Sequence, residues 1–267
     1  MAGKRSQQIL GPVAALKTSP ARSGRLYVVG VPIGDPDDMT VRGIRVLQAV
    51  DLIASEDPRA TQRLLAHHHI QATVTSYGPY QLRNKVGVLL ERLHQGADVA
   101  LVSDCGSPLI ADPGHLLVKA AHAQHIPVVT VPGPSAVIAA LTATGFPCDS
   151  FFFFGHLPVN PTRIARCLTT ALEREVPTVI FCTVASVARA LGILSNVAPR
   201  CRVVLSCDLT RSNERVLAGT ARQVNQKLFN VANQDLTLIL AGTKMRRRGA
   251  DRMKQDQSLS SRRIKIR

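Results

Sequence analysis

The prediction of this fold starts from residues 103–114, which have the sequence Ser103-Asp104-Cys105-Gly106-Ser107-Pro108-Leu109-Ile110-Ala111-Asp112-Pro113-Gly114. The apolar run 98–102 precedes them and predicts a buried strand, and a helical pattern follows at 115–124. Two glycines and two prolines among these twelve residues are typical of a specially shaped loop. In an open α/β sheet, ligands bind at this carboxyl end of the strands. The loop therefore predicts either a binding site or a plain strand-to-helix turn.

Strand and helix patterns alternate along the first half of the chain. Thr40 is a predicted helix N-cap, and Pro58 is well placed in the first turn of another helix. This β-α-β-α order predicts a mainly parallel sheet covered by helices. The predicted elements are a strand at 26–31, a helix from Val41, a strand at 51–55, a helix at 58–68, a short strand around Val74, a helix at 82–94 and the strand at 98–102.

The character of the sequence changes after Pro132. Four of the seven phenylalanines stand together at 151–154, and strand and helix patterns of different length follow. We therefore predict a domain junction near 132–135. The expected organisation is a basic N-terminal arm at 1–25, an α/β domain at 26–132, a second α/β domain at 133–243 and a basic C-terminal tail at 244–267.

Most of the positive charge stands in the two flanking segments. Residues 1–25 contain five Lys or Arg and no acid, and residues 244–267 contain ten Lys or Arg against two acids. These segments carry +13 of the net charge of +15, which leaves +2 for residues 26–243. Basic arms of this kind are either solvated tails or contacts for nucleic acid or an anionic membrane.

Several classes of site and location lack a signal in this sequence. Six cysteines without a Cys-x-x-Cys pair predict reduced thiols, a cytoplasmic location and no metal site. The triplet His67-His68-His69 ends a predicted helix, where imidazoles favour the helix dipole without a metal. No stretch approaches the roughly 20 apolar residues of a membrane helix, so no membrane partner is expected. The absence of acids before Asp35 leaves a transit peptide as an alternative.

Four loops at the predicted carboxyl ends of strands share a composition rich in Gly, Pro, Ser and Asp. They span 31–39, 55–59, 103–114 and 132–136. Such loops bring backbone groups onto an adenosine-like ligand with little side-chain obstruction. The spacing of Gly30 and Gly34 is not the dinucleotide fingerprint, and no glycine loop ends in the Lys-Ser/Thr of a nucleoside-triphosphate site. No Gly-x-Ser-x-Gly elbow supports a serine hydrolase.

Taken together and in order, these loops resemble the tetrapyrrole methylase superfamily of S-adenosyl-L-methionine-dependent methyltransferases. The resemblance is greatest to its ribosomal RNA small subunit methyltransferase I branch, which methylates the ribose 2′-hydroxyl of a cytidine. The matching stretches are LYVVGVPIG at 26–34, DLIASEDPR at 51–59, LVSDCGSPLIADPG at 101–114, VPGPSA at 131–136 and FFFFGHLP at 151–158. A weaker resemblance continues to about residue 242.

The resemblance implies two α/β domains with an inter-domain cleft that holds S-adenosyl-L-methionine. The positions that it assigns to the cofactor are Pro32, Gly34, Asp104, Cys105, Ser107, Ile110, Ser135 and Ala136. Glu56, Asp57 and Arg59 match a Glu-Asp-Thr-Arg element on the substrate side and are the catalytic candidates, with Pro58 in place of the threonine. The implied partners are the RNA of the small ribosomal subunit and a second copy of the chain in a homodimer.

Structural roles stand beside these assignments. Asp104 is also suited to capping a turn, Ser135 to capping a helix, and Arg59 to a solvated helix start. A general base would help a ribose hydroxyl to attack, and Glu56 and Asp57 are the candidates for it.

The sequence departs from the branch on the substrate side. An aromatic-Glu-Ser-x-His-Arg element is replaced at 182–187, and an Arg-Glu-Leu-Thr-Lys element becomes Cys-Asp-Leu-Thr-Arg at 207–211, with Glu214 in the place of a downstream acid. His156 replaces an aromatic residue, and the basic residue expected soon after it is absent at 159–160.

Three functions remain open at this stage. The first is the RNA 2′-O-methyltransferase, which the basic flanking segments suit. The second is a methyltransferase of the same superfamily that acts on a tetrapyrrole or a protein. The third is a cofactor-binding but catalytically reduced RNA-binding or ribosome-assembly protein.

Overall fold

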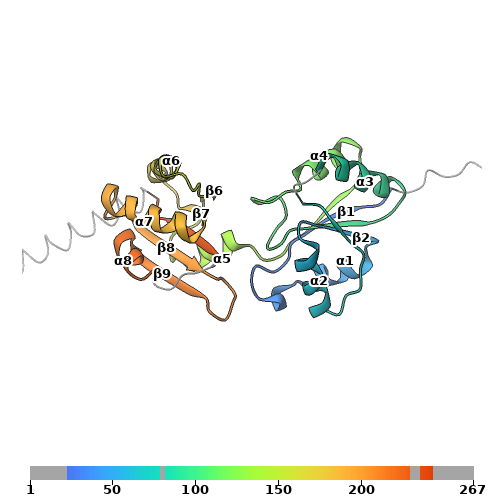
Figure 1. The fold of residues 1–267 in the computed structure, drawn as a ribbon, viewed down its shortest axis with the longest axis horizontal. Coiled ribbons are helices and arrows are strands. Elements are labelled where there is room, and N and C mark those ends of the chain that lie inside the picture. Colours follow the sequence, from blue (N-terminus) through green and yellow to red (C-terminus); the bar gives the residue numbers. More distant parts are fainter. Residues whose placement is uncertain (1–22, 79–81, 229–234, 243–267) are drawn as a thin grey trace, which may run out of the picture.

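The computed structural model describes residues 23–78, 82–228 and 235–242, and it has an α/β architecture with two five-stranded sheets. Figure 1 shows the two sheets side by side with their helices, joined by the segment that contains α5 (Ala136–Thr142). The basic arm and tail predicted from the sequence fall almost wholly outside these residues. No helix in the described part is long and apolar enough to cross a membrane.

The first sheet has the strand order β3-β2-β4-β1-β5, and among the described residues its neighbouring strands all pair in parallel. Its strands are β1 (Leu26–Val29), β2 (Leu52–Ser55), β3 (Val74–Ser76), β4 (Val99–Val102) and β5 (Val128–Val131). The connecting helices are α1 (Val41–Ala49), α2 (Pro58–His67), α3 (Leu82–His94) and α4 (His115–Ala123), with a 3-10 turn at Pro36–Asp38. The predicted parallel sheet is thus confirmed for this half of the chain.

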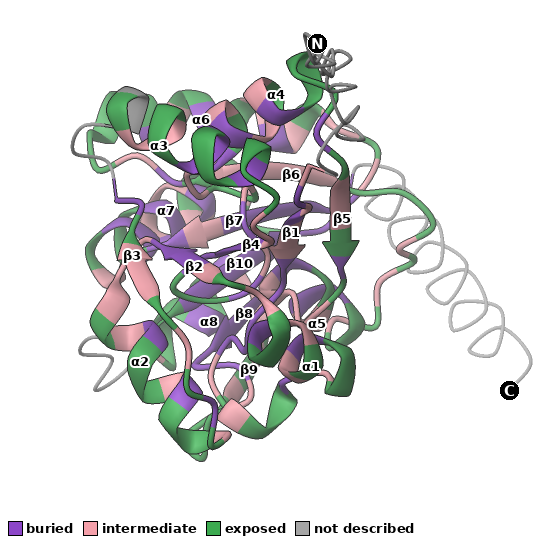
Figure 2. Ribbon diagram, turned by 90° about the vertical axis from the view of Figure 1, so that its right-hand side faces the viewer, coloured by how far each residue is buried: buried purple, intermediate pink, exposed green. Residues whose placement is uncertain are grey.

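Alternation along β4 explains why this sheet is covered on both faces. All four of its residues are buried. Val99 and Leu101 belong to a core with residues of α3 and α4, whereas Ala100 and Val102 belong to a core with residues of α1 and α2. Side chains alternate across a strand, so a continuous apolar run requires a helix layer on each side. Figure 2 shows the buried strands between helices whose outer faces are exposed.

The second sheet is mixed, with the order β6-β7-β10-β8-β9. β6 and β7 are parallel, and the remaining neighbours are antiparallel. Its strands are β6 (Phe152–His156), β7 (Thr178–Cys182), β8 (Arg202–Cys207), β9 (Arg215–Thr220) and β10 (Leu236–Leu240). Its helices are α6 (Pro161–Glu173), α7 (Val184–Val197) and α8 (Ala221–Gln226).

The two faces of the second sheet have different coverings. α6, α7 and α8 pack on one face around residues such as Leu168, Leu191 and Val224. On the other face, α5 packs with Val179 and Ile239 of the sheet, and Ile33 from the loop after β1 joins the same cluster. The first domain therefore contributes an apolar side chain to the inner face of the second sheet, and this contact positions the site.

Candidate active site

The loops after β1, β4 and β5 meet at the edge of the first sheet that is formed by the carboxyl ends of its strands. β1 lies between β4 and β5, so its carboxyl end has the other two as neighbours. The Val31 N–H donates to the Gly106 carbonyl at 2.8 Å, and the Gly106 N–H donates back to the Val31 carbonyl at 3.1 Å. This two-way bridge joins the loop after β1 directly to the loop after β4.

Glycines allow the loops after β1 and β5 to touch through their backbones. A Cβ atom added to Gly30 would lie 2.8 Å from the Gly133 nitrogen, and one added to Gly133 would lie 2.6 Å from the Gly30 carbonyl oxygen. Real Cβ atoms do not approach backbone so closely, so any side chain at either position would push the loops apart.

The loop 103–114 has an unusual backbone. Leu109 and Ala111 have positive φ angles of 73° and 63°, in the left-handed region that side chains disfavour. Positive φ values also occur at Gly106 and Gly114. Backbone strain of this kind persists where the surrounding structure enforces it, and it concentrates at ligand sites. This favours the binding-site interpretation of the loop over a plain turn.

The second domain reaches this edge through residues 208–214. A Cβ atom on Gly34 would lie 2.5 Å from the Leu209 carbonyl oxygen and 2.6 Å from Thr210 Oγ1. The Asp35 N–H donates to Thr210 Oγ1 at 2.8 Å. The absence of a side chain at Gly34 thus permits contact between the two domains.

Asp208 organises the segment 208–214 from within. It is 4% exposed, and its Oδ2 accepts from Asn213 Nδ2 at 2.6 Å while its Oδ1 accepts from the Asp235 N–H at 3.0 Å. Arg211 Nη2 donates to Asp235 Oδ2 at 2.8 Å. These bonds tie the loop to the start of β10 and fix Leu209 between them.

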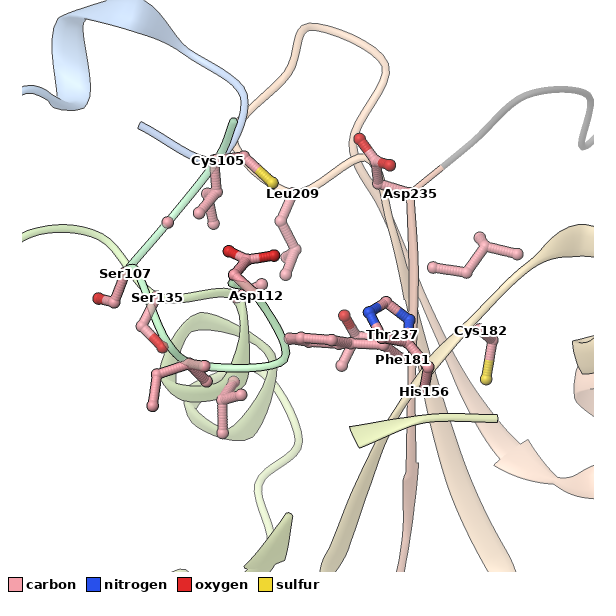
Figure 3. A pocket seen from close by; sticks show the side chains of 16 residues that line it. Cys105, Ser107, Asp112, Ser135, His156, Phe181, Cys182, Leu209, Asp235 and Thr237 are labelled. Atoms are coloured by element: carbon pink, nitrogen blue, oxygen red, sulfur yellow. The ribbon is translucent and has the colours of Figure 1, made fainter. Parts of the chain in front are cut away.

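A cavity of about 170 Å³ lies between the two domains. The first domain lines it with the loops after β1 and β4. The rest comes from α5 and the residue before it, from strands of the second sheet, and from Leu209 and Asp235 in loops next to those strands (Figure 3). Its lining residues are Ile33, Cys105, Gly106, Ser107, Ile110, Asp112, Ser135, Ala136, Val137, His156, Phe181, Cys182, Leu209, Asp235, Leu236 and Thr237.

The charged residues that line this cavity are acidic. Asp112 and Asp235 line it, and none of its described lining residues is a Lys or Arg. Burial raises the pKa of Asp112, and the charge of Asp104 raises it further, while His156 across the cavity lowers it. Desolvation, with contributions from Asp112 and Asp235, raises the pKa of the Cys105 thiol to about 11, so this thiol stays protonated at neutral pH.

A sequence profile of the family described as Tetrapyrrole (Corrin/Porphyrin) Methylases matches residues 25–225. The match includes all of the loops that form the first-domain wall of the cavity. The chain belongs to the tetrapyrrole methylase family. Solved methylase structures share its fold: uroporphyrin-III-C-methyltransferase from Thermus thermophilus superposes with a TM-score of 0.58 at 20% identity, over 83% of this chain and 96% of that one. Cobalt precorrin-4 methyltransferase gives 0.60 at 21% identity, over 82% and 95%.

Relatives with the name ribosomal RNA small subunit methyltransferase I are more similar in sequence to this methylase. The protein from Xylella fastidiosa is 39% identical over 213 residues, which are 79% of this chain and 78% of that protein. The protein from Escherichia coli O157:H7 is 42% identical over 197 residues, which are 72% of this chain and 68% of that protein.

The structure of this methylase distributes the predicted cofactor residues over two neighbouring spaces. Five of them, Cys105, Ser107, Ile110, Ser135 and Ala136, line the cavity. The remaining three, Pro32, Gly34 and Asp104, line an adjoining hollow that shares Cys105 with the cavity. Ser135 is the N-cap residue of α5, but its hydroxyl makes no capping hydrogen bond. The capping role therefore does not explain this serine.

The predicted catalytic residues Glu56, Asp57 and Arg59 are not among the lining residues of the cavity. Burial raises the pKa of Glu56, and the charges of Asp104 and Asp112 raise it further. Asp57 caps α2, because its Oδ1 accepts from the Arg59 N–H at 2.8 Å and the Ala60 N–H at 3.3 Å. The Asp57 N–H donates to Asp104 Oδ1 at 2.9 Å, which links the loops after β2 and β4.

The structure adds lining residues that the sequence did not assign to the site. Asp112 lies in the loop 103–114, whose composition makes it a detectable candidate, and His156 stands where the branch has an aromatic residue. Phe181, Leu209, Asp235 and Thr237 come from strands and loops distant in the chain. The pairing of the second sheet brings Phe181 and Thr237 to the cavity, and the bonds between the segment 208–214 and Asp235 bring Leu209 there.

Two residues of the histidine triplet, His67 and His68, have structural partners. His67 Nε2 lies 2.8 Å from Asp37 Oδ1, and His68 Nε2 lies 2.9 Å from the Pro36 carbonyl oxygen. Both histidines thus hold the 3-10 turn against the end of α2. Among the described residues, no group of three His, Cys, Asp or Glu side chains could hold a metal ion.

Proposed function

We propose that this chain transfers a methyl group from S-adenosyl-L-methionine to small-subunit ribosomal RNA, at the 2′-hydroxyl of a cytidine ribose. The observation that carries the proposal is the acidic cavity between the two domains, whose first-domain wall is built from the family's loops. The similarity to relatives with the name ribosomal RNA small subunit methyltransferase I supports the RNA acceptor. The enzyme acts in the cytoplasm as a homodimer.

The lining of the cavity suits this cofactor. S-adenosyl-L-methionine carries positive charge, and Asp112 and Asp235 present carboxylates without a competing Lys or Arg among the described lining residues. Ser107 and Ser135 present hydroxyls for its polar groups, and Ile33 offers an apolar surface. Pro32, Gly34 and Asp104 complete the first-domain wall at the adjoining hollow.

The bound cofactor supplies a methyl group on a positively charged sulfur, which is a good leaving group. The chain's own contribution is alignment. The loop 103–114 and the start of α5 fix one wall, and Leu209 and Phe181 fix the wall opposite. Because the acceptor oxygen must approach in line, holding it in one orientation between these walls accounts for much of the acceleration.

A ribose hydroxyl attacks poorly while it is protonated, so a proton acceptor is required. Glu56 takes this role, since its raised pKa makes it a stronger base than an ordinary glutamate. Asp57 holds the start of α2 next to Glu56, because its Oδ1 accepts hydrogen bonds from two backbone N–H groups there. Arg59 is exposed beside them and contacts the RNA.

Nucleoside analysis of the RNA product tests this proposal. The purified chain is incubated with S-adenosyl-L-methionine and small ribosomal subunits from cells that lack this methylation, and the RNA is digested to nucleosides. The proposal predicts one new 2′-O-methylcytidine per subunit. Methyl transfer to a protein or to a tetrapyrrole instead would assign a different acceptor. Binding of the cofactor without transfer to any ribosomal particle would favour an RNA-binding or ribosome-assembly role.

A further inference from the structure

A hollow of about 420 Å³ on the second domain adjoins the cavity. It is formed by the end of β6, the turn that follows it and one side of α6. Its lining residues are Phe154, His156, Pro158, Arg163, Arg166, Cys167 and Thr170. His156 lines both this hollow and the cavity, so the two spaces are direct neighbours.

The charge of the hollow is opposite to that of the cavity. Arg163 and Arg166 are both exposed, and their spacing with Thr170 places all three on one side of α6. Among the described residues, no carboxylate lines the hollow, and neither guanidinium is in a salt bridge. In this part of the chain the two guanidinium groups therefore lie next to a cavity whose charged lining residues, Asp112 and Asp235, are carboxylates.

The turn that carries the hollow is fixed in place. Arg189 Nη1 of α7 donates to the Val159 carbonyl at 3.0 Å, and Asn160 Oδ1 accepts from the Arg163 N–H at 3.2 Å. Asn160 is the N-cap of α6, with Pro161 in the first position of the helix. The two arginines thus project from a helix whose start is set by capping bonds, which makes the hollow a preformed surface.

The hollow that adjoins the cavity at Pro32 and Gly34 also has basic lining residues, Arg63, His67 and Arg211. It is less available for an anion, because His67 lies 2.8 Å from Asp37 and Arg211 lies 2.8 Å from Asp235. Asp104 also lines it. In the part of the chain that the structure describes, the hollow on α6 has neither a lining carboxylate nor a salt bridge to its arginines.

We propose that Arg163 and Arg166 bind the phosphate backbone of the RNA next to the nucleotide that is methylated. Guanidinium groups recognise phosphate oxygens in a planar, two-bond geometry. The carboxylates of the cavity repel phosphate while the arginines of the hollow attract it. The strand is thereby oriented with its phosphates over α6 and a ribose at His156, facing the cavity. This inference rests on the proposed function, because it takes RNA as the acceptor.

The salt dependence of RNA binding tests the inference. The variant Arg163→Gln/Arg166→Gln is compared with Arg45→Gln/Arg222→Gln, which removes the same charge from exposed positions on α1 and α8. The probe is the small ribosomal subunit from cells that lack the methylation. The logarithm of the binding constant falls linearly with the logarithm of the salt concentration. Loss of two phosphate contacts to a single strand makes this fall less steep, by about 1.4 in the slope. We expect this change for the α6 variant alone, with unchanged affinity for S-adenosyl-L-methionine.

A third variant, Arg163→Lys/Arg166→Lys, separates charge from packing and is expected to keep the native slope. Equal slopes for the α6 variant and its control would overturn the inference, and so would a native chain that does not bind the subunit. The two proposals fail separately. If the native chain methylates the RNA and the α6 variant behaves as its control, only the inference fails. If the α6 variant shows the expected change in slope but the native chain transfers no methyl group, only the proposed function fails.

Discussion

Glu56 and Asp112 are carboxyl groups whose ionisation the folded chain disfavours. Burial is the largest cause of the raised pKa in both, and the charge of Asp104 adds to it. A carboxyl group with a raised folded-state pKa binds its proton more tightly in the folded state. Its contribution to stability is therefore present at pH values below the unfolded-state pKa and is lost as the pH rises through the folded-state pKa. The stability that these groups contribute is therefore lost as the pH rises from acidic values toward neutrality.

Glu56→Gln is accordingly expected to change activity and stability in opposite directions. The variant removes a charge that is unfavourable at pH 7, so its melting temperature should exceed that of the native chain. The difference should shrink as the pH falls below the ordinary glutamate pKa of 4.5, where Glu56 is protonated in both the folded and the unfolded chain. Methyl transfer should fall by roughly 10² or more, as for loss of a general base. Thermal unfolding at several pH values and single-turnover assays measure both effects, and a fully active variant would exclude Glu56 as the base.

Gly34 is a second residue with a sharply defined requirement. Gly34→Ala places a methyl group against the Leu209 carbonyl, so the two domains must separate slightly. We expect a loss of about 1–3 kcal/mol in the free energy of unfolding and weaker binding of S-adenosyl-L-methionine. Gly87→Ala is the matched control, because no atom lies within 4 Å of the added group. At this exposed helix position alanine should stabilise the chain by up to about 1 kcal/mol. Equal behaviour of the two variants in denaturant titrations would contradict the contact.

At the scale of single elements, helix starts separate structural from binding roles. Thr40 Oγ1 accepts from the Gly43 N–H at 3.0 Å at the start of α1, as the sequence predicts. Ser135 occupies the same N-cap position in α5 without such a bond, and it lines the cavity. The local sequence predicts both N-cap positions equally well, and only the structure distinguishes them.

The variants Thr40→Ala and Ser135→Ala should therefore have contrasting effects. Loss of the Thr40 cap is expected to lower the free energy of unfolding by about 1 kcal/mol and to leave cofactor affinity unchanged. Ser135→Ala is expected to weaken the binding of S-adenosyl-L-methionine and to leave stability within about 0.5 kcal/mol. Calorimetric titration and denaturant unfolding of both variants make the comparison. Destabilisation by Ser135→Ala with native affinity would contradict its assignment to the cofactor.

Elements defined by local signals were predicted well, and elements defined by distant contacts were not. The apolar run of β4 and Pro58 at the start of α2 carry their signals in a few neighbouring residues. The segment 208–214 carries no such signal, because its shape depends on bonds between Asp208 and Asp235, which are 27 residues apart. For the same reason the contribution of Leu209 to the cavity could not be predicted.

At the scale of the whole molecule, the architecture followed from the alternation of strands and helices. The parallel first sheet is the arrangement that this alternation predicts. The mixed second sheet is different, since β10 pairs with β7 and β8 and not with a neighbour in the chain's order of strands. The periodicity of a strand does not indicate which distant strand it pairs with. The antiparallel pairings of the second sheet therefore could not be predicted from the sequence.

The distribution of charge also acts at this scale. Residues 244–267 contain ten Lys or Arg and two acids, while residues 26–243 are close to neutral. Deletion of 244–267 is expected to weaken binding to small ribosomal subunits and to reduce its dependence on salt, because phosphate contacts are lost. Affinity for S-adenosyl-L-methionine should not change. Filter binding over a range of salt concentrations measures this, and unchanged activity at every salt concentration would favour an acceptor other than RNA.

A crystal structure of the chain with S-adenosyl-L-methionine tests most directly whether the cavity between the two domains is the methyl-donor site. We expect density for the cofactor in contact with Ser107, Ser135 and Asp112, with its methyl group directed toward Glu56. Density for the cofactor at any other place, with this cavity filled only by solvent, would contradict it.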